Sequence, residues 1–175
     1  MNQVSEAVTR YHKILEGDHY KNLSWAHDLQ ERMKAHNLVA GGKPVSPVLR
    51  PHFITRRQYA GLVKAVESFS SSLQRVQAKA LNSPALMARM ELLPAEKMLA
   101  AIDPGYQVPE VAARLDSHLT NGTLHVVQYN ADSPTGSAYT EVLADLFYDS
   151  PPVKEFRKRY HLSRVAARRT CWERC

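Results

Sequence analysis

Four polar side chains flank an Asn-Gly pair and could together bind a metal ion and a phosphate group. Arg114 and Asp116 precede Asn121-Gly122, and Gln128 and Asn130 follow it. An aspartate offers a hard anionic oxygen for Mg²⁺, and an amide carbonyl can complete the coordination shell. Arginine pairs with phosphate oxygens through parallel hydrogen bonds. The sequence therefore holds the side chains of a metal–phosphate site, provided that one surface collects them.

The Asn-Gly pair predicts a β-hairpin over residues 113–130, because this dipeptide suits a tight turn between two strands. A two-residue turn would place Arg114 opposite Tyr129. A three-residue loop over residues 120–122 would place Arg114 opposite Gln128 and shift every later pair by one.

We favour the three-residue loop, because it collects the four polar side chains on one face of the hairpin. In that register Leu124 and Val126 also lie on the polar face. The other face is then wholly apolar and holds Ala113, Leu115, Val127 and Tyr129.

The segment after the second strand could bind a substrate. It reads as a loop by composition, and the hydroxyls of Ser133 and Thr135 and the backbone of Gly136 could contact a ligand there. The competing interpretation is that Arg114 and Asp116 form an ordinary cross-strand surface pair. From spacing alone this second interpretation is favoured by about two to one.

Other chemically active residue types give weaker patterns. The two cysteines, Cys171 and Cys175, are interpreted as incidental reduced thiols, since no ligand histidine is suitably spaced from them. The histidines form no i, i+4 ligand pair with a carboxylate partner on a well-predicted helix, although His118 and His125 could meet across the hairpin. The eight are His12, His19, His27, His36, His52, His118, His125 and His161.

The hairpin region resembles a known family. Arg114-Leu115-Asp116, then Gly122, then Val127-Gln128-Tyr129-Asn130-Ala131-Asp132-Ser133-Pro134-Thr135-Gly136 is similar to the R-x-D…E-Y-N-A-D-S/T-P pattern of circularly permuted ATP-grasp proteins. The group concerned is that of glutathionylspermidine synthase and its bacterial relatives. The resemblance is clearest over residues 110–150.

The resemblance implies an ATP-dependent carboxylate–amine ligase that uses Mg²⁺ and ATP and joins a small-molecule acid to an amine. By matching position it implies that Arg114 binds phosphate as a catalytic residue and that Asp116, Gln128 and Asn130 bind the metal. Ser133, Thr135 and Gly136 would belong to the loop that approaches the acid substrate.

Two departures from the family pattern reduce what is expected of this chain. Gln128 stands where the motif has glutamate, which removes one anionic metal ligand. In the permuted family the nucleotide-binding part follows the metal-binding strands, and no such part is recognised here. We therefore expect an N-terminal portion of a ligase-like protein that is inactive alone.

The elements that must position these residues are mostly helical, so the predicted fold class is α-rich α/β, a partial ATP-grasp-like domain. Helical layers are expected over residues 1–110, and residues 39–52 should form an extended connection. The clearest helix spans 56–80, and a last one spans 137–149. The apolar stripe of the 56–80 helix is expected in the core, and the hairpin is expected to pack on this helix or on missing strands. The stripe comprises Tyr59, Leu62, Val63, Val66, Phe69, Leu73 and Val76.

The charge of the chain is concentrated at its C-terminal end. The 175 residues carry a net charge of +6, and residues 153–175 hold eight Lys or Arg against two Glu. Residues 1–152 are therefore neutral, and they form the predicted ligase-like part. Residues 153–175 are predicted to be a basic segment that is aberrant or truncated from about residue 165.

Three hypotheses follow from this division. The favoured one is the N-terminal ligase fragment. The second is a small helical protein that contacts nucleic acid or another partner through Lys154, Arg157, Lys158, Arg159 and Arg164. The third and weakest is an enzyme that is active as it stands. A nucleic-acid partner is not favoured, since a charge run usually forms a solvated surface. The absence of a long apolar run and of a signal-peptide core predicts a cytoplasmic protein without a membrane partner.

Overall fold

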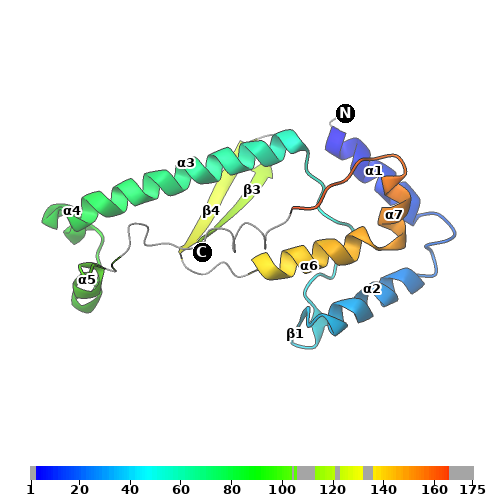
Figure 1. Ribbon diagram of the computed structural model, residues 1–175, viewed down its shortest axis with the longest axis horizontal. Coiled ribbons are helices and arrows are strands. Elements are labelled where there is room, and N and C mark those ends of the chain that lie inside the picture. Colours follow the sequence, from blue (N-terminus) through cyan, green and yellow to red (C-terminus); the bar gives the residue numbers. More distant parts are fainter. Residues whose placement is uncertain (1–2, 104, 106–112, 121–122, 132–135, 166–175) are drawn as a thin grey trace. The chain divides into compact units, whose positions relative to one another are not determined.

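The computed structural model describes residues 3–103, 105, 113–120, 123–131 and 136–165 (Figure 1). Within these residues the chain is an α-rich α/β protein with seven helices and two antiparallel two-stranded sheets, which confirms the predicted fold class. It divides into two compact units. Unit 1 comprises residues 1–55 and 134–175, and unit 2 comprises residues 56–133.

Unit 1 pairs helices that lie far apart in the sequence. Helix α1 (Gln3–Leu15) packs beside α7 (Pro151–Arg157), and α2 (Ser24–Ala35) packs beside α6 (Ser137–Tyr148) (Figure 1). The observed bounds of α6 agree with the helix expected over residues 137–149.

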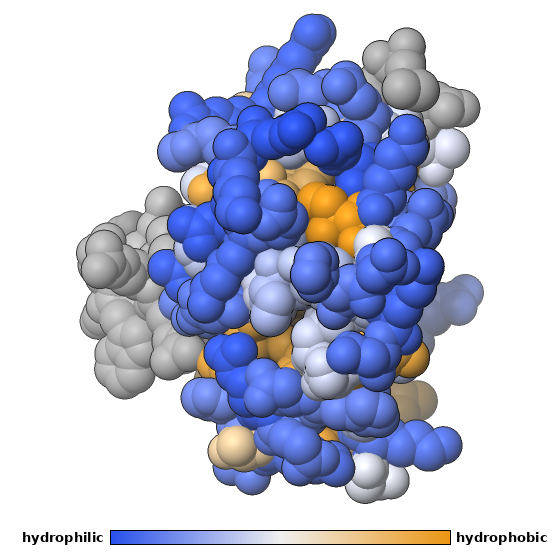
Figure 2. Space-filling model, turned by 90° about the vertical axis from the view of Figure 1, so that its right-hand side faces the viewer, coloured by the Kyte–Doolittle hydropathy of each residue, from blue (hydrophilic) through white to orange (hydrophobic). Residues whose placement is uncertain are grey.

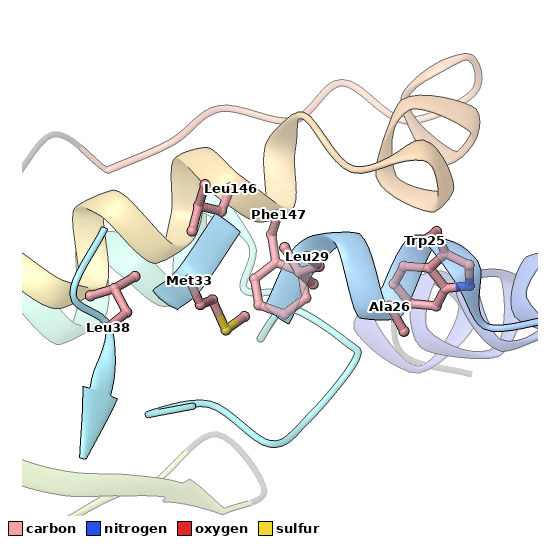
Figure 3. Packing of buried hydrophobic residues seen from close by; sticks show 7 residues of the cluster. All are labelled: Trp25, Ala26, Leu29, Met33, Leu38, Leu146 and Phe147. Atoms are coloured by element: carbon pink, nitrogen blue, oxygen red, sulfur yellow. The ribbon is translucent and has the colours of Figure 1, made fainter. Parts of the chain in front are cut away.

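The α2–α6 contact encloses the first hydrophobic cluster of unit 1. Trp25, Leu29 and Met33 recur at steps of four along α2, so they form one apolar stripe. Figure 3 shows Leu29 and Met33 close to Leu146 and Phe147 of α6. All of these side chains are buried, and Ala26 and Leu38 complete the cluster.

The α1–α7 contact encloses a second, aromatic cluster. Tyr11 of α1 and Phe156 of α7 are almost fully buried, and their ring centroids lie 5.8 Å apart. Phe53 contacts both rings, at 5.6 Å from Tyr11 and 4.9 Å from Phe156. The Tyr11 hydroxyl donates a hydrogen bond of 3.2 Å to the carbonyl of Leu49, which satisfies its buried polar atom.

The segment expected to be an extended connection contains a small hairpin. Strands β1 (Val39–Ala40) and β2 (Lys43–Pro44) pair antiparallel around Gly41 and Gly42. Both glycines have positive φ, 57° and 77°, which a two-residue type I′ turn requires and which glycine adopts without a steric penalty.

The described part of unit 2 contains three helices and the predicted hairpin. The long helix α3 spans Arg56–Leu81, close to the predicted 56–80. Two short helices follow, α4 (Pro84–Arg89) and α5 (Pro94–Ala100). Ser83 caps α4, because its hydroxyl accepts a hydrogen bond from the backbone N–H of Leu86.

The apolar stripe of α3 is not part of a core within the described residues, and this corrects the prediction. Tyr59, Val63, Val66 and Val76 are 38–50% exposed, and Ala80 is the one buried residue of the helix. The amphipathic pattern was read correctly as a helix. It shows what a helix can bury, whereas burial also needs a partner surface.

No described helix combines the length and the apolar character that a membrane span needs. The face seen in Figure 2 is mainly hydrophilic, with apolar residues visible in separate small areas.

Candidate functional site

The hairpin of unit 2 is built from β3 (Ala113–Thr120) and β4 (Thr123–Ala131). Next to the turn, Thr120 pairs with Thr123 and His118 pairs with His125. This is the register of a two-residue connection, so the favoured three-residue loop is wrong.

A β-bulge changes the register halfway along the hairpin. Ser117 pairs with Val126, but Asp116 pairs with Gln128, so Val127 is an extra residue in β4. Beyond the bulge Arg114 pairs with Asn130, which corrects the predicted pairing of Arg114 with Gln128. Relative to an unbroken two-residue hairpin, the predicted loop would move the partner of Arg114 from residue 129 to 128, whereas the bulge moves it to residue 130.

The bulge sorts the two faces of the hairpin. Arg114 and Asp116 lie on one face with their cross-strand partners Asn130 and Gln128, as predicted. Leu124 and Val126 pair with Leu119 and Ser117, so they lie on the opposite, apolar face, and their predicted place on the polar face is wrong. Val127, expected on the apolar face, is the bulged residue and is 69% exposed.

The four polar side chains form one hydrogen-bonded network. Arg114 donates to both oxygens of Asp116, from Nε to Oδ1 at 2.6 Å and from Nη2 to Oδ2 at 3.1 Å. The Asn130 amide donates to Asp116 Oδ2 at 3.4 Å, and the Gln128 amide donates to Asn130 Oδ1 at 3.0 Å. The sequence therefore identified a set of side chains that the structure brings together.

Asp116 is anionic in this network at neutral pH. The hydrogen bonds from Arg114, and to a smaller extent its positive charge and the Asn130 amide, hold the pKa of the Asp116 carboxyl below its ordinary value. The same hydrogen bond raises the pKa of Arg114. Asp116, the candidate metal ligand, and Arg114, the candidate phosphate partner, are thus both present in their charged forms.

The donor set suits a hard cation, although it carries little negative charge. Asp116, Gln128 and Asn130 place carboxylate and amide oxygens on one face, and these are the ligand types that Mg²⁺ prefers. Only one of the three is anionic. Both oxygens of Asp116 already accept hydrogen bonds from Arg114, so a cation on Asp116 competes with the guanidinium for the same carboxylate. Among the described residues no group of three or more His, Cys, Asp or Glu is arranged to hold a metal.

The predicted substrate loop is described only at its end. Ser133 and Thr135 lie outside the described residues. Gly136 immediately precedes α6 with a φ of 103°, and its carbonyl accepts hydrogen bonds from the backbone N–H and the hydroxyl of Thr140. The observed role of Gly136 is therefore to begin helix α6, and its contact with a substrate stays a prediction.

Two histidines on the same face of the hairpin were not part of the predicted site. His118 and His125 stack with ring centroids 5.2 Å apart, which confirms that they meet across the hairpin. Alternation along β3 puts His118 on the face of Asp116. The cross-strand spacing of the two histidines was the signal for this contact.

Comparison of the chain with protein-family models, with curated proteins and with solved structures finds no match. The resemblance to circularly permuted ATP-grasp proteins stays a prediction that rests on the residues quoted for it.

Proposed function

We propose that this chain carries part of the Mg²⁺–phosphate site of an ATP-dependent carboxylate–amine ligase-like protein of the cytoplasm. The observation that supports the proposal is the network of Arg114, Asp116, Gln128 and Asn130 on one face of the hairpin. Small-molecule acid and amine substrates are part of the proposal. Ser133, Thr135 and Gly136 are assigned to the acid-binding loop.

Each side chain has a defined part in this proposal. Arg114 binds a phosphate oxygen pair through its planar guanidinium. Asp116 supplies the anionic metal ligand, and Gln128 and Asn130 supply neutral amide oxygens. When bound, Mg²⁺ would neutralise charge on the transferring phosphoryl group.

The Arg114–Asp116 ion pair couples the two halves of the site. In the free hairpin each side chain occupies the other's ligand-binding atoms. A phosphate that takes over Arg114 frees an oxygen of Asp116 for a cation, and a cation on Asp116 frees Arg114 for phosphate. The two ligands should therefore bind with positive cooperativity.

The proposal assigns the adenine contacts and most phosphate contacts to elements outside this sequence. The chain alone should therefore bind divalent cations weakly, with a dissociation constant of about 1 mM, as expected for a site of low charge. It should release no ADP when it is mixed with ATP, an acid and an amine.

Paramagnetic Mn²⁺ is a suitable probe for the site in the full chain. We expect selective broadening of the amide resonances of residues 113–131, and tighter Mn²⁺ binding when inorganic phosphate is added. Asp116→Asn should abolish the broadening. Asp18→Asn is the matched control, since Asp18 is also an exposed aspartate in an ion pair, with Lys21. Equal broadening in the Asp116 variant would contradict the proposal.

A second variant tests the departure from the family pattern. Gln128→Glu adds an anionic oxygen beside Asp116, which lies directly opposite on β3. We expect Mn²⁺ to bind about tenfold tighter, because hard cations respond to the number of charged ligands. Unchanged affinity would mean that residue 128 does not face the ion.

A further inference from the structure

A polar pocket lies in unit 1 and is lined by residues of that unit alone. It has a volume of about 440 Å³, in the range of small-molecule sites. Its lining combines cationic side chains, Lys154, Arg157 and Lys158, with the rings of Tyr148, Tyr160 and His161. These residues come from the end of α6, from α7 and from the segment that follows α7.

The pocket has an excess of positive charge. No carboxylate is among the described residues that line it. Lys158 is paired with Glu155 at 2.5 Å. Within the described part of the chain neither Lys154 nor Arg157 forms an ion pair, so an anion in the pocket would meet two uncompensated cations.

The aromatic walls are held in place before any ligand binds. The Arg157 guanidinium lies 3.6 Å from the centroid of the Tyr148 ring, and that of Arg164 lies 4.6 Å from it. Arg164 is anchored in turn by an ion pair with Asp145. Because these contacts already order the side chains, a ligand that enters the pocket loses little binding free energy to ordering them.

Tyr160 ends a stack of three rings. Its ring is nearly parallel to that of Phe156, at 4° and 4.3 Å between centroids, and Phe156 stacks on Phe53 at 4.9 Å. Phe156 covers one side of the Tyr160 ring, and Tyr160 also lines the pocket. A planar ligand could extend the stack there.

We propose that this pocket binds a small aromatic phosphate ester, with the phosphate on Lys154 and Arg157 and the ring against Tyr160. The cations recognise the anion and the ring stack recognises a planar group. This site is separate from the hairpin and does not depend on the proposed ligase function. A small ligand is favoured over a polynucleotide, because Lys158 and Arg164 already have carboxylate partners within unit 1.

Three probes separate the two parts of the recognition. In an amide NMR titration of the full chain, phenyl phosphate should give saturable shifts at residues 148–162. Inorganic phosphate should bind about tenfold more weakly, since one stacked ring contributes on the order of 1–3 kcal/mol. Phenol alone should give no saturable shift.

Two matched variants test the place of binding. Lys154→Gln removes a cation from the pocket and should weaken phenyl phosphate binding at least about tenfold, the scale of one hydrogen bond to a charged group of about 1.5 kcal/mol. Arg159→Gln removes the same charge from an exposed residue outside the lining and should leave binding unchanged.

Several results would overturn the assignment. Equal weakening in both variants would mean diffuse attraction by net charge. Shifts confined to residues 113–131 would mean that the ligand binds the hairpin instead. Saturable binding of a single-stranded oligonucleotide that phenyl phosphate does not displace would identify a nucleic-acid surface, and no saturable binding would remove the site.

Discussion

The two units of the chain differ in what their helices bury. Among the described residues, eleven of the twelve buried hydrophobic side chains belong to unit 1, and Ala80 alone belongs to unit 2. Both units contain amphipathic helices. In unit 1 these helices pair with each other, whereas the stripe of α3 stays largely exposed.

The difference shows that an amphipathic helix does not form a hydrophobic core unless another apolar surface packs against it. The hairpin that carries the candidate metal–phosphate site packs against α3 through one described ring contact, Phe69 with Tyr129 at 5.9 Å. A two-stranded hairpin is marginal in water unless other elements cover it. The site residues of unit 2 are therefore held mainly by strand pairing and by their own hydrogen bonds.

The largest expected difference between the units comes from truncating one phenylalanine in each. Phe156→Ala should lower the free energy of unfolding by about 3–5 kcal/mol, because it removes a ring at the centre of the α1–α7 cluster. Phe69→Ala should cost less than about 1 kcal/mol, since its ring is only partly buried. Urea unfolding followed by far-ultraviolet circular dichroism measures both. Equal losses would show that unit 2 has a core of similar strength.

The alkaline limit of unit 1 should depend on Tyr11. Burial raises the pKa of this phenol well above its ordinary value near 10. The unfolded chain then releases the proton at a pH where the folded chain keeps it, so stability is complete below pH 10 and falls as the pH rises further.

Tyr11→Phe tests this dependence. The variant should lose about 0.5–1.5 kcal/mol at pH 7 with the hydrogen bond to Leu49, and its stability should fall less steeply above pH 10. Tyr139→Phe, at an exposed tyrosine, is the control. Unfolding curves between pH 7 and 11 that stay parallel for all three proteins would contradict the assignment.

The smallest expected effect concerns the ion pair in unit 2. Arg114→Gln should raise the pKa of Asp116 toward its ordinary value, because the hydrogen bond from Arg114 is the main cause of its low pKa. Asn130→Ala should raise it less, since that amide donates a single bond of 3.4 Å. A depressed carboxyl pKa stabilises the fold above the unfolded pKa and loses this effect as the pH falls through the folded one. Carbon-detected titration of the carboxyl resonances measures the pKa, and an unchanged value in Arg114→Gln would disprove the pairing in solution.

Local features were predicted well from the sequence. The bounds of α3 and the presence of the hairpin follow from apolar spacing and turn residues. The bulge at Val127 could not be distinguished from a longer turn, because the two move the pairing by one position in opposite directions and both bring amide side chains of β4 opposite Arg114. The four polar side chains were therefore correctly predicted to share a face, although the predicted register and the predicted faces of Leu124 and Val126 were wrong.

Long-range pairing was outside the reach of the sequence pattern. Residues 153–175 were assigned to a separate basic segment, yet Val153 and Phe156 are buried against Ala7 and Tyr11 of α1. The basic residues of α7 indicate only its exposed side. The helix is too short for its apolar spacing to predict a buried face. The stripe of α3 is the opposite case, because its apolar pattern is clear and yet most of its residues stay exposed.

Amide hydrogen exchange of the full chain tests the contrast between the units most directly. We expect the buried stretches of α1, α2, α6 and α7 to exchange only through global unfolding, and α3 and the hairpin to exchange through openings of much lower free energy. The expected separation in protection is at least about 100-fold, or about 2.7 kcal/mol. Equal protection of α3 and α2 would contradict the account, because it would require a core in unit 2.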